Sequence, residues 1–131
     1  MNRKLGDFEG IWHLNRTIRH ADGTQAHFIG QCSFTPRGGG MDYQETGVLT
    51  LPGAAPFEAQ QSYRWGRGMA VTFPNGRAFH RVPPQGGPVA HWCKPDQYDG
   101  TYDFAAWPDW TLTWTVQGPR KDYTSVTHYR R

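Results

Sequence analysis

Apolar and polar residues alternate with a period of two along most of this chain. The first clear example is residues 10–18, where Trp12, Leu14, Arg16 and Ile18 share one face. The cleanest is residues 110–117, where Trp110, Leu112, Trp114 and Val116 alternate with three threonines and a glutamine. Such alternation is typical of antiparallel strands that bury one face. The face that carries Trp12 is therefore expected to point inward.

The full pattern predicts ten short strands, over residues 10–18, 25–35, 41–51, 57–65, 69–73, 77–82, 89–94, 101–106, 110–117 and 123–130. The dipeptides Asp22-Gly23 and Asn75-Gly76 favour tight hairpins, because these residue types tolerate positive φ. Residues 83–88 are rich in proline and glycine and are predicted to be a connection, and residues 95–100 a turn. No ten-residue window shows convincing helical periodicity.

Short strands joined by short turns, without a crossover helix, predict an all-β fold. An up-and-down antiparallel sheet removes its exposed edges most simply by closing into a barrel, here of about 8–10 strands with the last strand beside the first. A two-sheet β-sandwich is the alternative architecture. With 131 residues, the chain is expected to form a single domain over residues 1–131. A barrel of this size should enclose a cavity.

The segment Gly10-Ile11-Trp12 is expected to close one end of this barrel. Glycine permits a tight backbone path, and tryptophan is a large, rigid apolar group that can plug the end of a cylinder. The last strand finishes with Arg130 and Arg131. If that strand lies beside the first, an arginine can cover the Trp12 ring in a cation–π contact.

Composition narrows the possible partners. Aromatic residues make up 15% of the chain, and 16 glycines and 10 prolines suit strands and turns. The formal charge is +3, but the basic residues are scattered among acids, so nucleic-acid binding is not expected.

No secretory signal or membrane span is recognisable, which predicts a cytoplasmic protein with Cys32 and Cys93 as free thiols. The sequence does not predict the oligomeric state.

Arg16 is the most informative polar residue, because it lies in phase with apolar neighbours. A buried guanidinium needs a partner. One interpretation is an internal ion pair with Glu45, which shares a predicted inner face with Tyr43. The other is that Arg16 binds the carboxylate or phosphate of a ligand.

A second group of candidates surrounds residues 77–98. Arg77, Phe79 and His80 lie on one predicted strand, and His91 lies on the next, so the two histidines could face one another. The spacing of His91, Cys93 and Asp96 matches no strong metal signature, and no metal is predicted. Satisfied core histidines or proton-donating pocket residues are the expected roles.

The sequence thus favours a barrel that binds a small anionic, partly apolar or aromatic molecule. The predicted ligand-binding residues are Arg16, Tyr43, Glu45, Tyr63, Trp65, Arg77, Phe79, His80, His91, Tyr102 and Trp114. One alternative is a small lyase- or isomerase-like enzyme that uses Glu45, His80 or His91 as an acid or base. The second alternative is a protein-interaction module that uses Trp92 or Trp107.

Six segments together resemble a known group of proteins: residues 10–16, 43–47, 63–65, 75–80, 91–98 and 118–123. The chain looks like a calycin, the superfamily of lipocalins, fatty-acid-binding proteins and nitrobindin-like barrels. More closely, it resembles a family of uncharacterised bacterial lipocalin-like proteins known as a domain of unknown function. The resemblance covers about nine tenths of the chain.

The resemblance implies a ligand held inside the barrel and no established activity. Haem-binding members use a histidine near the C-terminal strands, and here His128 is the candidate so placed. It lies on the strand face opposite Tyr129, so haem is not expected, and no other cofactor is predicted. Some barrels of this shape are decarboxylases that act through Tyr, Arg and Glu, residue types that Arg16, Tyr43 and Glu45 share.

Overall fold

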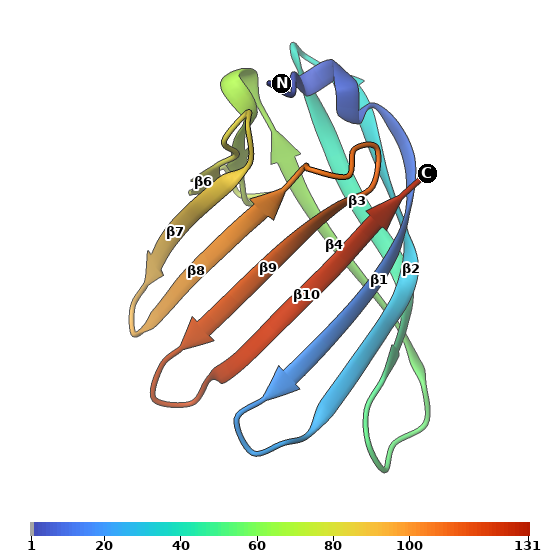
Figure 1. The fold of residues 1–131 in the computed structure, drawn as a ribbon, viewed down its shortest axis with the longest axis vertical. Coiled ribbons are helices and arrows are strands. Elements are labelled where there is room, and N and C mark those ends of the chain that lie inside the picture. Colours follow the sequence, from blue (N-terminus) through green and yellow to red (C-terminus); the bar gives the residue numbers. More distant parts are fainter. Residues whose placement is uncertain (1) are drawn as a thin grey trace.

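The computed structural model describes residues 2–131, which form a cylinder of ten antiparallel strands (Figure 1). Two short 3-10 turns accompany them, η1 (Leu5–Phe8) and η2 (Arg67–Met69). The strands are β1 (Gly10–His20), β2 (Gln25–Arg37), β3 (Gly40–Thr50), β4 (Phe57–Trp65), β5 (Ala70–Thr72), β6 (Ala78–Arg81), β7 (Gly87–Cys93), β8 (Asp96–Asp103), β9 (Trp110–Gln117) and β10 (Asp122–Arg130).

The strand order confirms the predicted up-and-down barrel. Hydrogen bonds join the strands in the order β6-β5-β4-β3-β2-β1-β10-β9-β8-β7, so the last strand pairs with the first, with Leu14 opposite Tyr129. Within the described residues no ladder joins β6 to β7, which are the two edges of the sheet. The barrel is therefore nearly closed, and the two-sheet sandwich is excluded.

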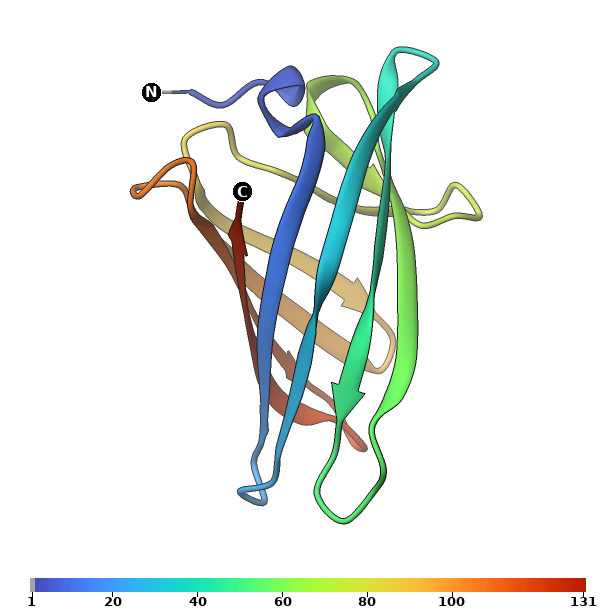
Figure 2. The same cartoon turned by 90° about the vertical axis from the view of Figure 1, so that its right-hand side faces the viewer.

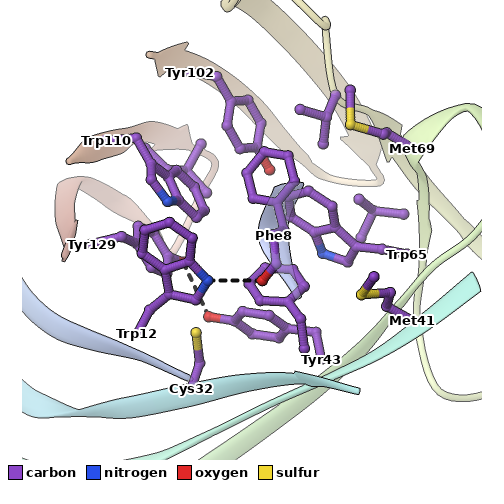
Figure 3. Close-up of a cluster of buried hydrophobic side chains, with 14 of the residues drawn as sticks. Phe8, Trp12, Cys32, Met41, Tyr43, Trp65, Met69, Tyr102, Trp110 and Tyr129 are labelled. Atoms are coloured by element: carbon purple, nitrogen blue, oxygen red, sulfur yellow. Dashed lines mark hydrogen bonds between the residues drawn. The ribbon is translucent and has the colours of Figure 1, made fainter. Parts of the chain in front are cut away.

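Aromatic side chains close one end of the barrel, here called the capped end, where η1 and both termini lie (Figures 1 and 2). Phe8 and Trp12 are fully buried there, as Figure 3 shows. The indole Nε1 of Trp12 donates to the Phe8 carbonyl at 2.9 Å. Trp107 and Trp110 pack edge-on against both rings. Trp12 is thus the predicted plug.

The predicted arginine lid is also present. The Arg131 guanidinium lies 4.1 Å from the centre of the Trp12 ring. Its Nη2 donates to the carbonyl oxygens of Asp7 and Glu9, at 2.6 and 3.1 Å. The last residue of the chain is therefore tied to the segment that precedes β1, and the two ends of the sequence together close the barrel.

The predicted strands agree with the structure to within a few residues except around residues 83–106, where the strand predicted over residues 101–106 ends at Asp103. Residues 96–100 are strand rather than turn, because only Lys94 and Pro95 separate the paired residues Cys93 and Asp96. Gly87 and Pro88 also belong to β7. Proline is tolerated there because β7 is an edge strand, where a missing N–H breaks no ladder hydrogen bond. In the described part of the chain, no helix has the length and apolar character needed to cross a bilayer.

Strands β2 and β3 approach each other closely at Gly30. Gly30 lies opposite Gly47, and a β-carbon on Gly30 would collide with the backbone of Thr46. A β-carbon on Gly47 would lie 2.8 Å from the Phe28 ring. The glycine pair therefore lets the sheet curl sharply and lets Phe28 lie flat on the inner wall.

Candidate functional site

A cavity of about 590 Å³ lies inside the barrel. It extends from Trp65 and Tyr129 near the capped end to Leu51 and Cys93 at the opposite, open end, where four hairpins lie (Figure 2). This volume is typical of small-molecule sites. Ten of the eleven predicted ligand-binding residues line it: Arg16, Tyr43, Glu45, Tyr63, Trp65, Phe79, His80, His91, Tyr102 and Trp114.

Arg77 is the predicted residue that the structure does not bring into the cavity. It lies in the turn that precedes β6, its side chain is exposed, and its backbone N–H donates to Asn75 Oδ1 at 3.0 Å. The Asn75-Gly76 turn takes up the start of the predicted strand 77–82, so the alternation does not extend to Arg77. Arg16 is consequently the arginine of the cavity wall.

Arg16 and Glu45 form the ion pair that one interpretation of the sequence proposed. Arg16 Nη1 donates to Glu45 Oε2 at 2.7 Å and Nη2 to Oε1 at 3.0 Å, while Nε donates to Thr127 Oγ1 at 2.7 Å. The Glu45 side chain is only 3% exposed, whereas that of Arg16 is 17% exposed. Burial alone would lower the pKa of Arg16, but the hydrogen bonds and charge of Glu45 outweigh burial and raise it. Arg16 therefore keeps its positive charge inside the barrel.

Two tyrosines complete this network at the capped end. Tyr43 donates to Glu45 Oε1 at 2.6 Å, and its hydroxyl lies 3.0 Å from that of Tyr129 (Figure 3). Burial, and then the charges of neighbouring groups, raise the pKa values of both tyrosines above the ordinary value. Both hydroxyls therefore stay protonated. The Glu45 carboxylate is occupied by Arg16 and Tyr43, which leaves it poorly placed to act as a base.

Arg16 keeps part of its hydrogen-bonding capacity. Its guanidinium has five N–H groups, of which three are used by Glu45 and Thr127. Its flat face lies 5.2 Å from the centre of the Phe28 ring, the ring that Gly47 allows to lie flat. The guanidinium is thus held in one orientation, and the two N–H groups that these partners do not use lie on opposite edges of it.

Aromatic rings form the wall opposite Arg16. Phe79 stacks on Trp114, with ring centres 5.2 Å apart and planes 11° apart, and Phe73 stacks on Phe79 at 4.6 Å and 21°. His91 contacts both phenylalanine rings edge-on or tilted, at 5.1 and 5.8 Å. Half of the residues that line the cavity carry a ring. The wall therefore presents several aromatic faces to the cavity.

A β-bulge places two consecutive residues of β6 on the cavity wall. Val71 lies opposite His80 and Thr72 opposite Ala78, so Phe79 has no partner of its own. Bulges re-aim side chains in this way. The His80 Nε2 atom lies 2.8 Å from the Tyr102 hydroxyl, within hydrogen-bonding distance. Burial, and then the charge of His91, lower the pKa of His80 to about 4, so the imidazole is neutral and a weak base at neutral pH.

Several residues of the wall were not predicted from the sequence. Thr127 binds Arg16, Phe73 stacks on Phe79, and Gln61 also lines the cavity. Thr127 was recoverable, because alternation in residues 123–130 puts it in phase with Tyr129. Phe73 was recoverable in the same way, because the predicted strand 69–73 puts it in phase with Val71.

The sequence also singled out a possible haem ligand, possible metal ligands, two cysteines and two tryptophans. His128 is exposed on the outer face, opposite Tyr129, as alternation predicted. Within residues 2–131 no three His, Cys, Asp or Glu side chains are grouped to hold a metal ion. Cys32 and Cys93 are both free thiols. Trp107 packs into the cap, whereas Trp92 is 59% exposed.

Residues 8–131 match the model of a family described as "Family of unknown function (DUF6314)". The chain belongs to this family. The prediction of an uncharacterised lipocalin-like family is thereby confirmed. No curated protein sequence matches the chain.

Two solved structures share the fold. One is the S-type phycobiliprotein lyase CPES from Guillardia theta, with 7% identity, a TM-score of 0.65, and coverage of 97% of this chain and 89% of that one. The other is a de novo designed fluorescence-activating β-barrel, with 14% identity, a TM-score of 0.50 and full coverage of both chains. At these identities the similarity establishes the barrel fold alone.

Proposed function

We propose that this barrel binds a small, partly aromatic acid inside its cavity. The observation that carries the proposal is a 590 Å³ cavity with a ring-lined wall and a single, partly exposed arginine among its lining residues. The rings of the ligand pack on Trp65, Phe79, Trp114 and Tyr102. One of its acidic oxygens accepts from an N–H group of Arg16 that Glu45 and Thr127 leave unused.

The ion pair between Arg16 and Glu45 determines how strongly the cavity can bind an acid. Because Glu45 already neutralises Arg16, a ligand carboxylate gains a charge-assisted hydrogen bond but no unbalanced positive charge. Glu45 and Thr127 fix the guanidinium before the ligand arrives, which reduces the ordering cost of binding. The pair thus acts as a fixed hydrogen-bond donor rather than as a free cation.

The two similar structures support a role for the interior. One is named a lyase for phycobiliproteins and the other a fluorescence-activating barrel. Barrels of this shape therefore accommodate both enzymatic and designed optical functions, which is consistent with an interior that receives a molecule.

Three probes of similar size test the proposal: 2-naphthoic acid, 2-naphthamide and decanoic acid. Binding is measured by calorimetry and by native mass spectrometry. We expect 2-naphthoate to bind most tightly, because it alone combines flat rings with an acid. The amide offers Arg16 a neutral acceptor in place of a carboxylate and should bind about tenfold more weakly, since hydrogen bonds to charged groups exceed neutral ones by about 1–1.5 kcal/mol.

Two variants provide the matched comparison. Trp114→Leu removes a ring from the wall and should weaken 2-naphthoate binding. Trp92→Leu removes a tryptophan that is 59% exposed on the opposite face of its strand from His91, and should leave binding unchanged. If none of the three probes binds, or decanoate binds best, the proposed function is wrong.

A further inference from the structure

The seam between β6 and β7 is the one place in the described sheet where neighbouring strands share no ladder. Side chains cross it instead. Phe79 of β6 stacks on Trp114 of β9, and the hydrogen bond between His80 and Tyr102 joins β6 to β8. The barrel is therefore closed at the seam by rings and one polar contact, which can separate without breaking backbone hydrogen bonds.

Trp114 is the fixed half of the stacked pair. It lies opposite Gly100 of β8, and a β-carbon on Gly100 would be 2.7 Å from the indole ring and 2.9 Å from Val89 of β7. The missing side chain at position 100 lets the indole lie flat across β8 toward the seam. The outer face of the indole lies against the backbone at Gly100, and its inner face contacts the Phe79 ring.

Phe79 is the movable half. It is the bulged residue of a hairpin whose strands have only three and four residues, and two residue pairs join this hairpin to β4. The connections at both ends of the hairpin contain residues with positive φ: Gly68 and Met69 on one side, at 65° and 58°, and Gly86 on the other, at 81°. Short ladders and irregular connections of this kind mark the least stable parts of a sheet.

His80 adds a polar group beside the stacked rings. Its Nδ1 atom is buried and has no hydrogen-bond partner within the described residues, while Nε2 contacts Tyr102. A neutral imidazole that accepts from Tyr102 at Nε2 carries its proton on Nδ1. In that tautomer Nδ1 is an unpaired donor next to the Phe79 and Trp114 rings, and in the other it is an unpaired acceptor; a polar atom of a ligand would satisfy it in either form.

We propose that Phe79 and Trp114 form an aromatic clamp that takes a planar, unsaturated ring of the ligand between them when the β5–β6 hairpin moves outward at the seam. The proposal rests on the proposed function and names the chemistry of its ligand. Inserting one ring separates the two side-chain planes to about 7 Å, twice the contact distance of stacked carbon atoms. A saturated ring is thicker and lacks the π-faces that make stacking favourable.

The test compares 2-naphthoic acid with decahydro-2-naphthoic acid, which has the same carbon skeleton and the same acid group but is not planar. We expect 2-naphthoate to bind about tenfold more tightly to the wild type, the equivalent of about 1.4 kcal/mol for its two stacked faces. Phe79→Leu and Gly100→Ala should both remove this preference. The first deletes one face of the clamp, and the second forces the indole out of its flat position. Trp92→Leu is the control.

Two further measurements locate the ring directly. In NMR spectra of the complex, the naphthoate ring protons should shift upfield and show Overhauser contacts with Phe79 and Trp114. In hydrogen exchange, amides of residues 70–81 should exchange faster than those of β1 to β3 in the free protein and slow down when 2-naphthoate binds.

The outcomes separate the two proposals. If 2-naphthoate binds but contacts Tyr43 and Trp65 at the capped end, or if planar and saturated acids bind equally, the clamp is refuted and the proposed function stands. If neither acid binds, both proposals fail.

Discussion

Replacing His80 with glutamine should remove a large part of the acid sensitivity of this fold. The native pKa of His80 is lowered to about 4 from an ordinary value of 6.5, by burial and by the charge of His91. Between these two values the unfolded chain binds a proton at this position and the native barrel does not. Stability from His80 is therefore fully present above pH 6.5 and is lost as the pH falls toward 4.

The size of the effect follows from these two pKa values. The difference between 6.5 and about 4 corresponds to about 3 kcal/mol in total, of which about 2 kcal/mol is lost between pH 7 and pH 5. The groups that face His80 are the rings of Phe79, Trp114 and His91 and the Tyr102 hydroxyl, so among residues 2–131 no carboxylate in contact with the ring offsets this loss.

The assay is urea unfolding at pH 7, 6 and 5, followed by tryptophan fluorescence. Glutamine can still contact Tyr102 but does not titrate, so the wild type should lose about 2 kcal/mol more than His80→Gln over this range. His27→Gln, at an exposed position on the outer face, is the control and should retain the wild-type pH dependence. Equal losses in the wild type and His80→Gln, or an NMR titration of His80 near pH 6.5, would contradict this explanation.

Three further predictions concern stability and reactivity. Arg16→Met leaves the buried Glu45 carboxylate unpaired and should cost about 3–5 kcal/mol in urea unfolding, most of which Arg16→Met with Glu45→Gln should restore. Gly47→Ala places a methyl group against the Phe28 ring and the β2 backbone, and should cost at least about 1–3 kcal/mol. In the native protein, Cys93 should react with a thiol reagent while Cys32 should not, because Cys32 is buried and burial raises its pKa to about 12.

For each of these three predictions, one result would contradict the explanation or one control variant tests it. If the single and double variants at Arg16 and Glu45 are equally unstable, the penalty does not come from an unpaired charge. Gly6→Ala, where a β-carbon meets no atom within 4 Å, is the control for Gly47→Ala and should be nearly neutral. Equal reaction rates for the two thiols would mean that the barrel wall at Cys32 opens readily.

The fold and most of the cavity wall can be inferred from the order of residues alone. Alternation with a period of two settles which face of a strand is buried, because successive side chains point to opposite sides. Alternation therefore predicts that Trp12, Arg16, Glu45 and Trp114 point into the barrel. The pairing of the first and last strands, and the arginine over Trp12, followed from the need to close the sheet.

The three-dimensional arrangement was needed to show where that alternation fails and which residues meet across the interior. The Asn75-Gly76 turn kept Arg77 out of the cavity, the bulge brought both Phe79 and His80 into it, and the seam lies at β6 and β7. The ion pair of Arg16 with Glu45 likewise joins strands far apart in sequence. The physical reason is that period two is a local property of each strand, whereas register shifts, strand ends and cross-barrel contacts depend on how the whole sheet curls.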